Sequence, residues 1–231
     1  GDSDYITSIL RSFYGNSNLS IFGNVNYKNF TNKNLKENGF ENLYDLKGSK
    51  QEIEDISDMY NSYRFRNHSL EIYKPTETNF KSTDFSSTDY VLLSMHGISF
   101  EDDYKKSSLL FEEDDINDGF LRYNEVFEID LSNINTIVLS ACETNKGRRA
   151  TNIHTLSIQQ AFKSAGAENV VASMWKVDDL ATAQLMKEFF SILPFNNSPT
   201  LSLKKAKIKM INSGKYSNPH YWAGFVNYGI Y

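Results

Sequence analysis

The residues best suited to covalent chemistry are the only cysteine, Cys142, and His96, which lies 46 positions before it. Each follows an apolar run typical of a buried strand, residues 136–141 before the cysteine and 90–95 before the histidine. A thiol is a weak nucleophile, and an unperturbed cysteine with a pKa of about 8.5 is only slightly ionised at neutral pH. A neighbouring imidazole accepts its proton. If the two strands are neighbours, the pair predicts a cysteine nucleophile with a histidine base.

Two other interpretations of these residues remain open. A lone cysteine is often a small buried hydrophobic residue, and a His-Gly pair such as His96-Gly97 is often a turn. A redox-sensing cysteine would need a resolving thiol on a partner, because this chain contains one cysteine. Taken alone, the residues leave catalysis, packing and redox sensing as alternatives.

Strand and helix patterns alternate along the chain. Apolar runs without alternation indicate strands buried on both faces, and helical periodicity fills the intervals between them. The expected strands are 19–23, 69–73, 90–95, 136–141, 169–174 and 222–227, and the expected helices are 49–60, 76–81, 123–129, 156–164, 179–193 and 202–211. This order predicts an α/β fold with a mostly parallel six-stranded sheet and helices on both faces. Sites in such sheets lie beyond the carboxyl ends of the strands, which places loops 24–27, 96–99 and 142–147 on one rim.

Local signals refine this outline. Ser49 is expected at the N-cap of its helix, with Glu52 three positions later completing a capping box. The acidic stretch 101–118 is expected to form a surface excursion with a small hairpin, which would carry the apolar patch 109–111 outside the core. The expected division is an extension or linker over 1–18 and one domain over 19–231, with an acidic insertion at about 99–119.

Composition disfavours several classes of function. A net charge of −5 without a basic stripe argues against nucleic-acid binding. No apolar stretch approaches the roughly 18 to 20 residues of a membrane helix. A single cysteine cannot form an intramolecular disulfide, so a reducing, cytoplasmic compartment is expected. No metal and no cofactor are expected, because the remaining histidines lack the spacing of ligands. They are His68, His154 and His220.

A set of ordered motifs extends beyond the two reactive residues. After the strand that ends in His96-Gly97, the chain reads Leu-Ser-Ala-Cys-Glu-Thr at 139–144 and Ala-Gly-Ala at 165–167. Val-Val-Ala-Ser-Met-Trp follows at 170–175, and Asn-Pro-His-Tyr-Trp-Ala-Gly-Phe at 218–225. In this order the motifs resemble the CHAT domain, a family of caspase-like cysteine peptidases that is also related to separases. The likeness covers about residues 19–229.

The resemblance implies a caspase-like sheet in which His96 and Cys142 form a catalytic dyad. Cys142 would attack the scissile carbonyl, and water would later hydrolyse the acyl-enzyme. The backbone N–H groups of Gly97 and Cys142 would form the oxyanion hole. The segment Ser-Ala-Cys-Glu-Thr differs from the Gln-Ala-Cys-x-Gly signature of caspases, so the chain is expected to be a cousin of caspases rather than a member of that group.

The resemblance also implies where a substrate would bind. The pocket for the P1 residue, which precedes the cleaved bond, would combine the end of the first strand with the segment after the fifth. The expected substrate-binding residues are Asn24, Ser173, Met174, Trp175, Asp178 and Asp179. CHAT relatives often have an aspartate where this chain has Asn24, so Asp178 or Asp179 would have to supply the carboxylate. A basic P1 residue ranks first and a bulky neutral one second. Asp179 fits equally well as the N-cap of the next helix.

By family resemblance, the expected function is a cysteine endopeptidase that cleaves a specific protein in a prokaryotic defence or cell-death system. The alternative is a catalytically silent CHAT-like scaffold or switch in a larger assembly, because such domains often follow tetratricopeptide repeats. Expected partners are therefore a protein substrate and a helical-repeat region or regulatory partner. Arg148-Arg149 is a possible autoprocessing site, against the simpler interpretation of a solvated loop.

Overall fold

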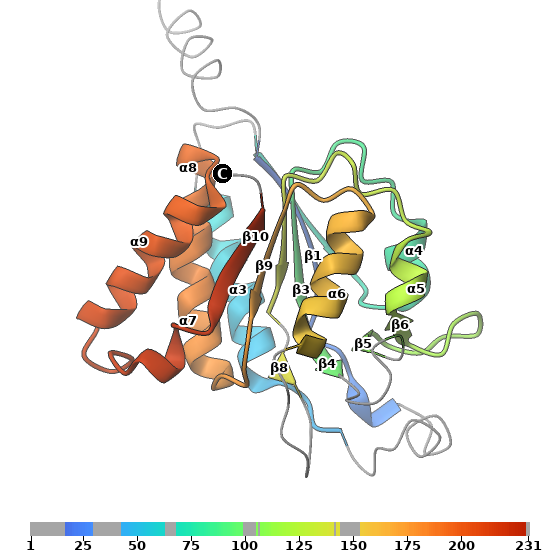
Figure 1. The fold of residues 1–231 in the computed structure, drawn as a ribbon, viewed down its shortest axis with the longest axis horizontal. Coiled ribbons are helices and arrows are strands. Elements are labelled where there is room, and N and C mark those ends of the chain that lie inside the picture. Colours follow the sequence, from blue (N-terminus) through green and yellow to red (C-terminus); the bar gives the residue numbers. More distant parts are fainter. Residues whose placement is uncertain are drawn as a thin grey trace, which may run out of the picture.

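The computed structural model describes residues 17–29, 43–62, 68–98, 105, 107–140, 142–143 and 153–229, with the backbone alone described at 29, 142–143 and 153–157. Its centre is a six-stranded sheet in the order β10-β9-β7-β3-β1-β2 (Figure 1). The strands are β1 (Ser17–Gly23), β2 (His68–Tyr73), β3 (Tyr90–Ser94), β7 (Thr136–Leu139), β9 (Asn169–Ser173) and β10 (Phe225–Gly229). Only the pairing of β10 with β9 is antiparallel, which confirms the predicted mostly parallel six-stranded sheet.

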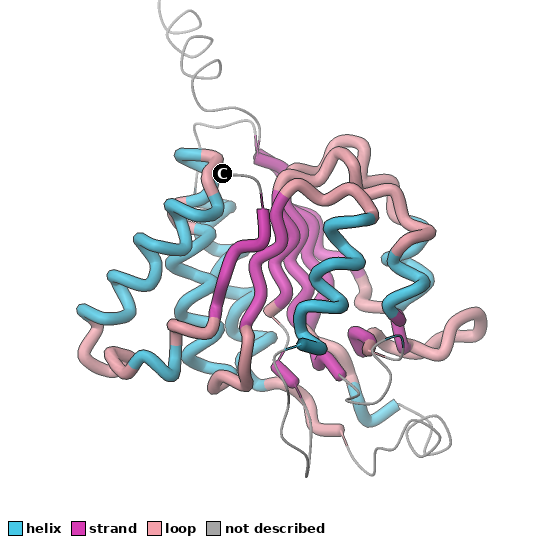
Figure 2. The backbone as a smooth tube through the Cα atoms, in the orientation of Figure 1, coloured by secondary structure: helices cyan, strands magenta, loops and turns pink. Residues whose placement is uncertain are grey.

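Alternate residues of the central strands pack into two separate hydrophobic cores, one on each face of the sheet. In β3, Val91 and Leu93 belong to one core, whereas Tyr90 and Leu92 belong to the other. Helices α4 (Glu77–Ser82), α5 (Tyr123–Val126) and α6 (Ile153–Ser164) cover the first face, while α3 (Lys47–Ser62), α7 (Asp179–Phe190) and α9 (Pro199–Asn212) cover the second (Figures 1 and 2). Burial on both faces explains why the strands lack polar alternation.

A second, smaller sheet lies beyond the carboxyl ends of the large one. It has the order β6-β5-β4-β8 and consists of β4 (His96–Ile98), β5 (Ser108–Leu110), β6 (Phe120–Arg122) and β8 (Cys142–Glu143). The antiparallel strands β5 and β6 form a hairpin, but its second strand lies just after the stretch 101–118 in which the hairpin was expected. The expectation that patch 109–111 lies outside the core is wrong, because Leu109, Leu110 and Phe111 are all buried in the first core. The free energy gained by burying these three side chains exceeds the preference of the neighbouring acidic residues for solvent.

Several helix boundaries differ from the sequence expectation. Helix α3 begins at Lys47, so Ser49 and Glu52 do not form the expected capping box. Helix α7 ends at Phe190, and the short helix α8 (Leu193–Asn196) follows it with a proline in its first turn. Two 3-10 turns, η1 (Tyr27–Asn29) and η3 (Pro219–Tyr221), complete the described elements.

Candidate functional site

Strands β4 and β8 bring His96 and Cys142 into register. The two strands are parallel, and the backbones of His96 and Cys142 are direct partners, with Gly97 beside Glu143. This follows from the large sheet, because β3 leads into β4, β7 leads into β8, and β3 and β7 are adjacent parallel strands. Two strands that end side by side deliver the residues after them to the same rim.

The imidazole of His96 is held in one tautomer. Its Nε2 lies 2.7 Å from the carbonyl oxygen of Tyr44, and a carbonyl can only accept, so Nε2 must carry the proton. Nδ1 is then the atom with the lone pair. It is buried and has no hydrogen-bond partner among the residues that the structure describes. The free basic nitrogen is the one that can receive a proton.

Burial also controls the charge of this imidazole. His96 is 5% exposed, and loss of solvent lowers its pKa from the usual 6.5, a trend that the positive charge of Lys176 reinforces. The Tyr44 carbonyl and the Asp45 carboxylate act in the opposite direction but do not reverse the shift. His96 is therefore neutral at pH 7, the state in which it can act as a base.

Tyr27 holds the backbone of His96. Its hydroxyl accepts the His96 amide N–H at 2.7 Å and donates to the carbonyl oxygen of Leu110 at 3.1 Å, while its ring lies 4.6 Å from the imidazole. Complete burial raises the pKa of the phenol far above its normal value, which keeps it protonated. Sequence reasoning placed Tyr27 in a rim loop but gave it no role. An aromatic residue in a polar, Asn-rich stretch was the available signal.

Glu52 connects the two strands that lead to His96 and Cys142. Its Oε2 accepts a hydrogen bond from the hydroxyl of Ser94, two residues before His96. Ser140, two residues before Cys142, lines the same small cavity as Glu52 and lowers the pKa of its carboxyl. The side chain is 1% exposed, and its Oε1 has no partner within the described residues. Burial raises its pKa to about 7, against the effects of Ser94 and Ser140, which lower it. A glutamate on the apolar face of α3 was the sequence signal for this role.

Ser49 secures the end of β1 to the same cluster. Its hydroxyl donates to the carbonyl oxygen of Ser94 at 2.9 Å and accepts the amide N–H of Asn24 at 2.8 Å. Asn24 itself has a φ of 57°, a left-handed conformation that asparagine tolerates better than most residues. The Ser49 hydroxyl therefore binds the backbone at the ends of β1 and β3 and does not cap its own helix.

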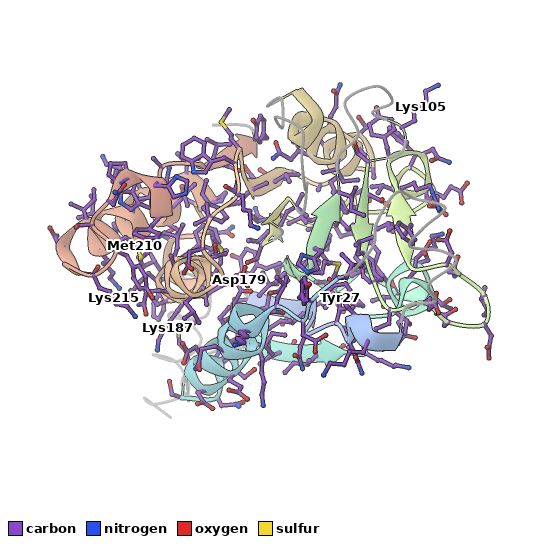
Figure 3. The ribbon with its side chains drawn as sticks, turned by 90° about the horizontal axis from the view of Figure 1, so that it is seen from below. Tyr27, Lys105, Asp179, Lys187, Met210 and Lys215 are labelled. Atoms are coloured by element: carbon purple, nitrogen blue, oxygen red, sulfur yellow. The ribbon has the colours of Figure 1, made fainter. Side chains whose placement is uncertain are left out.

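A small cavity of about 10 Å³ lies beside these residues. It is lined by Leu46, Gly48, Ser49, Glu52, Ser94, Ser140, Asp179 and Thr182. Figure 3 views this edge of the molecule from below, with Asp179 at the start of α7 and Tyr27 also at this edge. Burial, followed by the nearby charge of Asp178, raises the pKa of Asp179. Two carboxyl groups thus border one cavity next to the strand ends.

The other expected substrate-binding residues have specific local roles. Asp178, rather than Asp179, is the N-cap of α7, because its carboxylate accepts the amide N–H of Ala181 at 3.0 Å. The amide N–H of Met174 is bonded to the carbonyl oxygen of Gly224 at 2.9 Å, so it cannot pair with a substrate strand. The Ser173 hydroxyl contacts the Trp175 carbonyl oxygen at 2.6 Å.

Trp175 is the aromatic residue among the expected substrate-binding residues. Its indole is 36% exposed, and it donates to the carbonyl oxygen of His220 at 3.1 Å and stacks on the His220 ring at 6.4 Å. Gly224 packs directly beneath, where a Cβ atom would lie 2.7 Å from the indole. The ring is therefore fixed in place with one surface open to solvent.

Two negative findings concern only the described residues. No group of three or more His, Cys, Asp or Glu side chains in that part of the chain could hold a metal ion. None of the helices described there is long and apolar enough to cross a membrane. The expected autoprocessing site at Arg148-Arg149 lies outside the described residues.

Comparison with known proteins identifies the family and the fold. A family model described as the CHAT domain matches residues 26–230. The crystal structure of the Arg-specific cysteine proteinase gingipain R superimposes with a TM-score of 0.53 and 14% identity, covering 99% of this chain and 52% of that one. The complex of Porphyromonas gingivalis RgpB pro- and mature domains gives 0.51 and 13%, covering 99% and 53%. The architecture is therefore that of caspase-like cysteine peptidases.

Curated relatives match over shorter segments. Tetratricopeptide repeat protein 28 of Mus musculus is 32% identical over 97 residues, which is 42% of this chain and 4% of that protein. The protein of the same name from Homo sapiens is 28% identical over 144 residues, or 57% of this chain and 6% of that protein. This chain therefore corresponds to a small fraction of the length of these relatives.

Proposed function

Because the chain belongs to the CHAT domain family, we propose that it is a cysteine endopeptidase in which His96 and Cys142 form the catalytic dyad. The observation that carries this proposal is the buried Nδ1 of His96, which has no hydrogen-bond partner in the described part of the chain, next to a strand register that pairs His96 with Cys142. The fixed tautomer leaves that nitrogen as the base, and the lowered pKa keeps it unprotonated at neutral pH.

The proposed reaction begins with transfer of the Cys142 thiol proton to Nδ1 of His96. The thiolate attacks the carbonyl carbon of the scissile peptide bond, and the backbone N–H groups of Gly97 and Cys142 stabilise the oxyanion. The imidazolium then protonates the leaving amine as the carbon–nitrogen bond breaks. Water hydrolyses the resulting thioester after His96 accepts one of its protons, which restores the thiol. The Tyr44 carbonyl accepts from Nε2–H throughout.

The proposed substrate is a protein cleaved after a basic residue. Support comes from the two carboxyl groups beside the cavity and from the fold shared with a proteinase whose name specifies arginine. Asn24, Ser173, Trp175 and Asp179 remain the proposed substrate contacts from the sequence. Asp178 caps a helix, which makes it the weaker of the two aspartates as a ligand for P1.

Cleavage of a peptide library tests this function. The wild-type protein is expected to cleave peptides whose P1 residue is basic, and Cys142→Ala is expected to cleave none. A strict preference for P1 aspartate would contradict the proposed specificity, and equal cleavage by Cys142→Ala would contradict the proposed nucleophile.

A second candidate function is a catalytically silent module that binds a helical-repeat region. The similarity to proteins named for tetratricopeptide repeats favours it. Repeat binding and catalysis are compatible, so the discriminating observation is the chemistry of Cys142. A silent module would leave this thiol no more reactive toward a peptidyl electrophile than free cysteine. The role in prokaryotic defence or cell death stays a proposal from family resemblance.

A further inference from the structure

We infer that the cavity beside the strand ends binds a cationic P1 side chain, with lysine as the best fit and Glu52 as the carboxylate that receives its charge. This rests on the proposed peptidase function but adds a residue that no sequence motif assigned. It also replaces the carboxylate missing at Asn24 with one from a different element, helix α3.

The cavity has an open side and a closed end. Leu46 and Asp179 are partly exposed, whereas Ser49, Glu52, Ser94 and Ser140 are buried. The same four buried residues line the cavity. A side chain that enters past Leu46 and Asp179 would therefore meet Glu52 at the closed end. Ser140 belongs to this end and lies two residues before Cys142, so the pocket adjoins the proposed nucleophile.

The two oxygens of Glu52 have different environments. Oε2 accepts the Ser94 hydroxyl, which fixes the carboxylate in place. Oε1 has no partner within the described residues, although it is completely buried. A buried polar oxygen without a hydrogen bond is costly, and a donor brought by a substrate removes that cost. The Thr182 hydroxyl at the same cavity is also buried and unpartnered in the described part of the chain.

The charges around the cavity favour a cation. Glu52 and Asp179 repel one another, since each negative charge disfavours a second one nearby. Neither carboxylate forms an ion pair with a lysine or arginine among the described residues. The charge of Lys176 lowers the pKa of Asp179 but does not reverse its upward shift. A substrate ammonium would satisfy both carboxylates at once.

The size of the cavity favours lysine. Its volume of about 10 Å³ is roughly the room of one water molecule, so any side chain that enters must displace the walls. An ammonium is a compact point charge on a slender stem, whereas a guanidinium is a wide planar fork. Lysine can therefore reach Oε1 with less displacement of Asp179 than arginine requires.

Three peptides that differ only at P1 test the pocket. Lysine and norleucine have the same stem and differ in the ammonium, and arginine tests width. Wild-type protein is expected to give a kcat/KM for lysine about 10- to 100-fold above that for norleucine, the range of one hydrogen bond to a charged group. Glu52→Gln keeps the shape and the contact with Ser94, and is expected to bring the ratio to about one. Arginine should fall between the two.

Glu54→Gln is the matched control. It removes a carboxylate from the same helix α3, at an exposed side chain that does not line the cavity, so it makes the same chemical change outside the pocket. The lysine preference should survive in this variant. Retention of the full preference in Glu52→Gln would overturn the inference, as would equal kcat/KM for lysine and norleucine in the wild type.

Binding to Cys142→Ala, measured by calorimetry, separates the pocket from the chemistry. The lysine peptide should bind more tightly than the norleucine peptide at pH 8, and the difference should shrink at pH 5.5 as Glu52, whose pKa is about 7, is protonated. This holds even if Glu52→Gln fails to fold. Selective binding without any cleavage by the wild type would retain the pocket and refute the peptidase. Cleavage with no lysine preference in either assay would retain the peptidase and refute the pocket.

Discussion

Replacement of Glu52 by glutamine should remove a large pH dependence from the stability of the protein. Burial raises the pKa of Glu52 from an ordinary value of 4.5 to about 7 in the folded state. The folded state therefore binds the Glu52 proton more tightly than the unfolded state does. Stability from this group is fully present below pH 4.5 and is lost as the pH rises through about 7.

The size of the effect follows from the shift. Each pKa unit corresponds to about 1.4 kcal/mol, so the difference between 4.5 and about 7 is worth about 3 kcal/mol. Glutamine carries no titrating proton but can still accept the hydrogen bond of Ser94. Between pH 4.5 and pH 8 the free energy of unfolding of the wild type should therefore fall by about 3 kcal/mol relative to that of Glu52→Gln.

Urea denaturation of both proteins at several pH values measures this difference. Other titrating groups contribute to both proteins alike, so the comparison isolates Glu52, apart from its coupling to Asp179. Asp178→Asn should leave the pH dependence close to that of the wild type. If the wild type and Glu52→Gln lose stability in parallel as the pH rises, the pKa of Glu52 is not raised in the folded state.

Substitutions at Tyr27, Phe111 and Asp178 test other parts of the structure. Tyr27→Phe should cost about 1–3 kcal/mol in urea denaturation, because the buried amide of His96 loses its acceptor; an unchanged midpoint would refute that bond. Phe111→Ala should cost about 3–5 kcal/mol, whereas Ile116→Ala, at a side chain that is 78% exposed, should change stability by less than about 0.5 kcal/mol. Equal effects would mean that patch 109–111 lies at the surface after all. Asp178→Ala should cost about 1 kcal/mol and Asp178→Asn almost nothing, and equal losses would exclude the helix cap.

The sheet could be predicted because its strands are apolar on both faces. Residues such as Val91 and Leu92 point to opposite cores, and this produces runs without alternation that are visible in the sequence. The shared location of His96 and Cys142 followed from the same pattern, since each comes directly after such a run. Patch 109–111 was misjudged because acidic neighbours indicated solvent, while packing against Phe22 and Phe80 decided the outcome.

The supporting residues were hidden because their roles depend on contacts between distant segments. Ser49 and Glu52 have the spacing of a capping box, and only the position of α3 against the strand ends turns both side chains toward Ser94. The Tyr44 carbonyl has no sequence signature, since every residue possesses a carbonyl. The sequence held two clues, a glutamate on an apolar helix face (Glu52) and an aromatic residue in a polar stretch (Tyr27).

Covalent labelling of Cys142 by a peptidyl electrophile with lysine at P1 tests the central claim most directly. Intact-mass measurement should show one adduct per wild-type chain at pH 7.5, with His96→Ala slowed by at least about 100-fold, within the usual contribution of a general base. Cys142→Ala should not react. Equal rates in the wild type and His96→Ala would contradict a dyad in which His96 accepts the thiol proton.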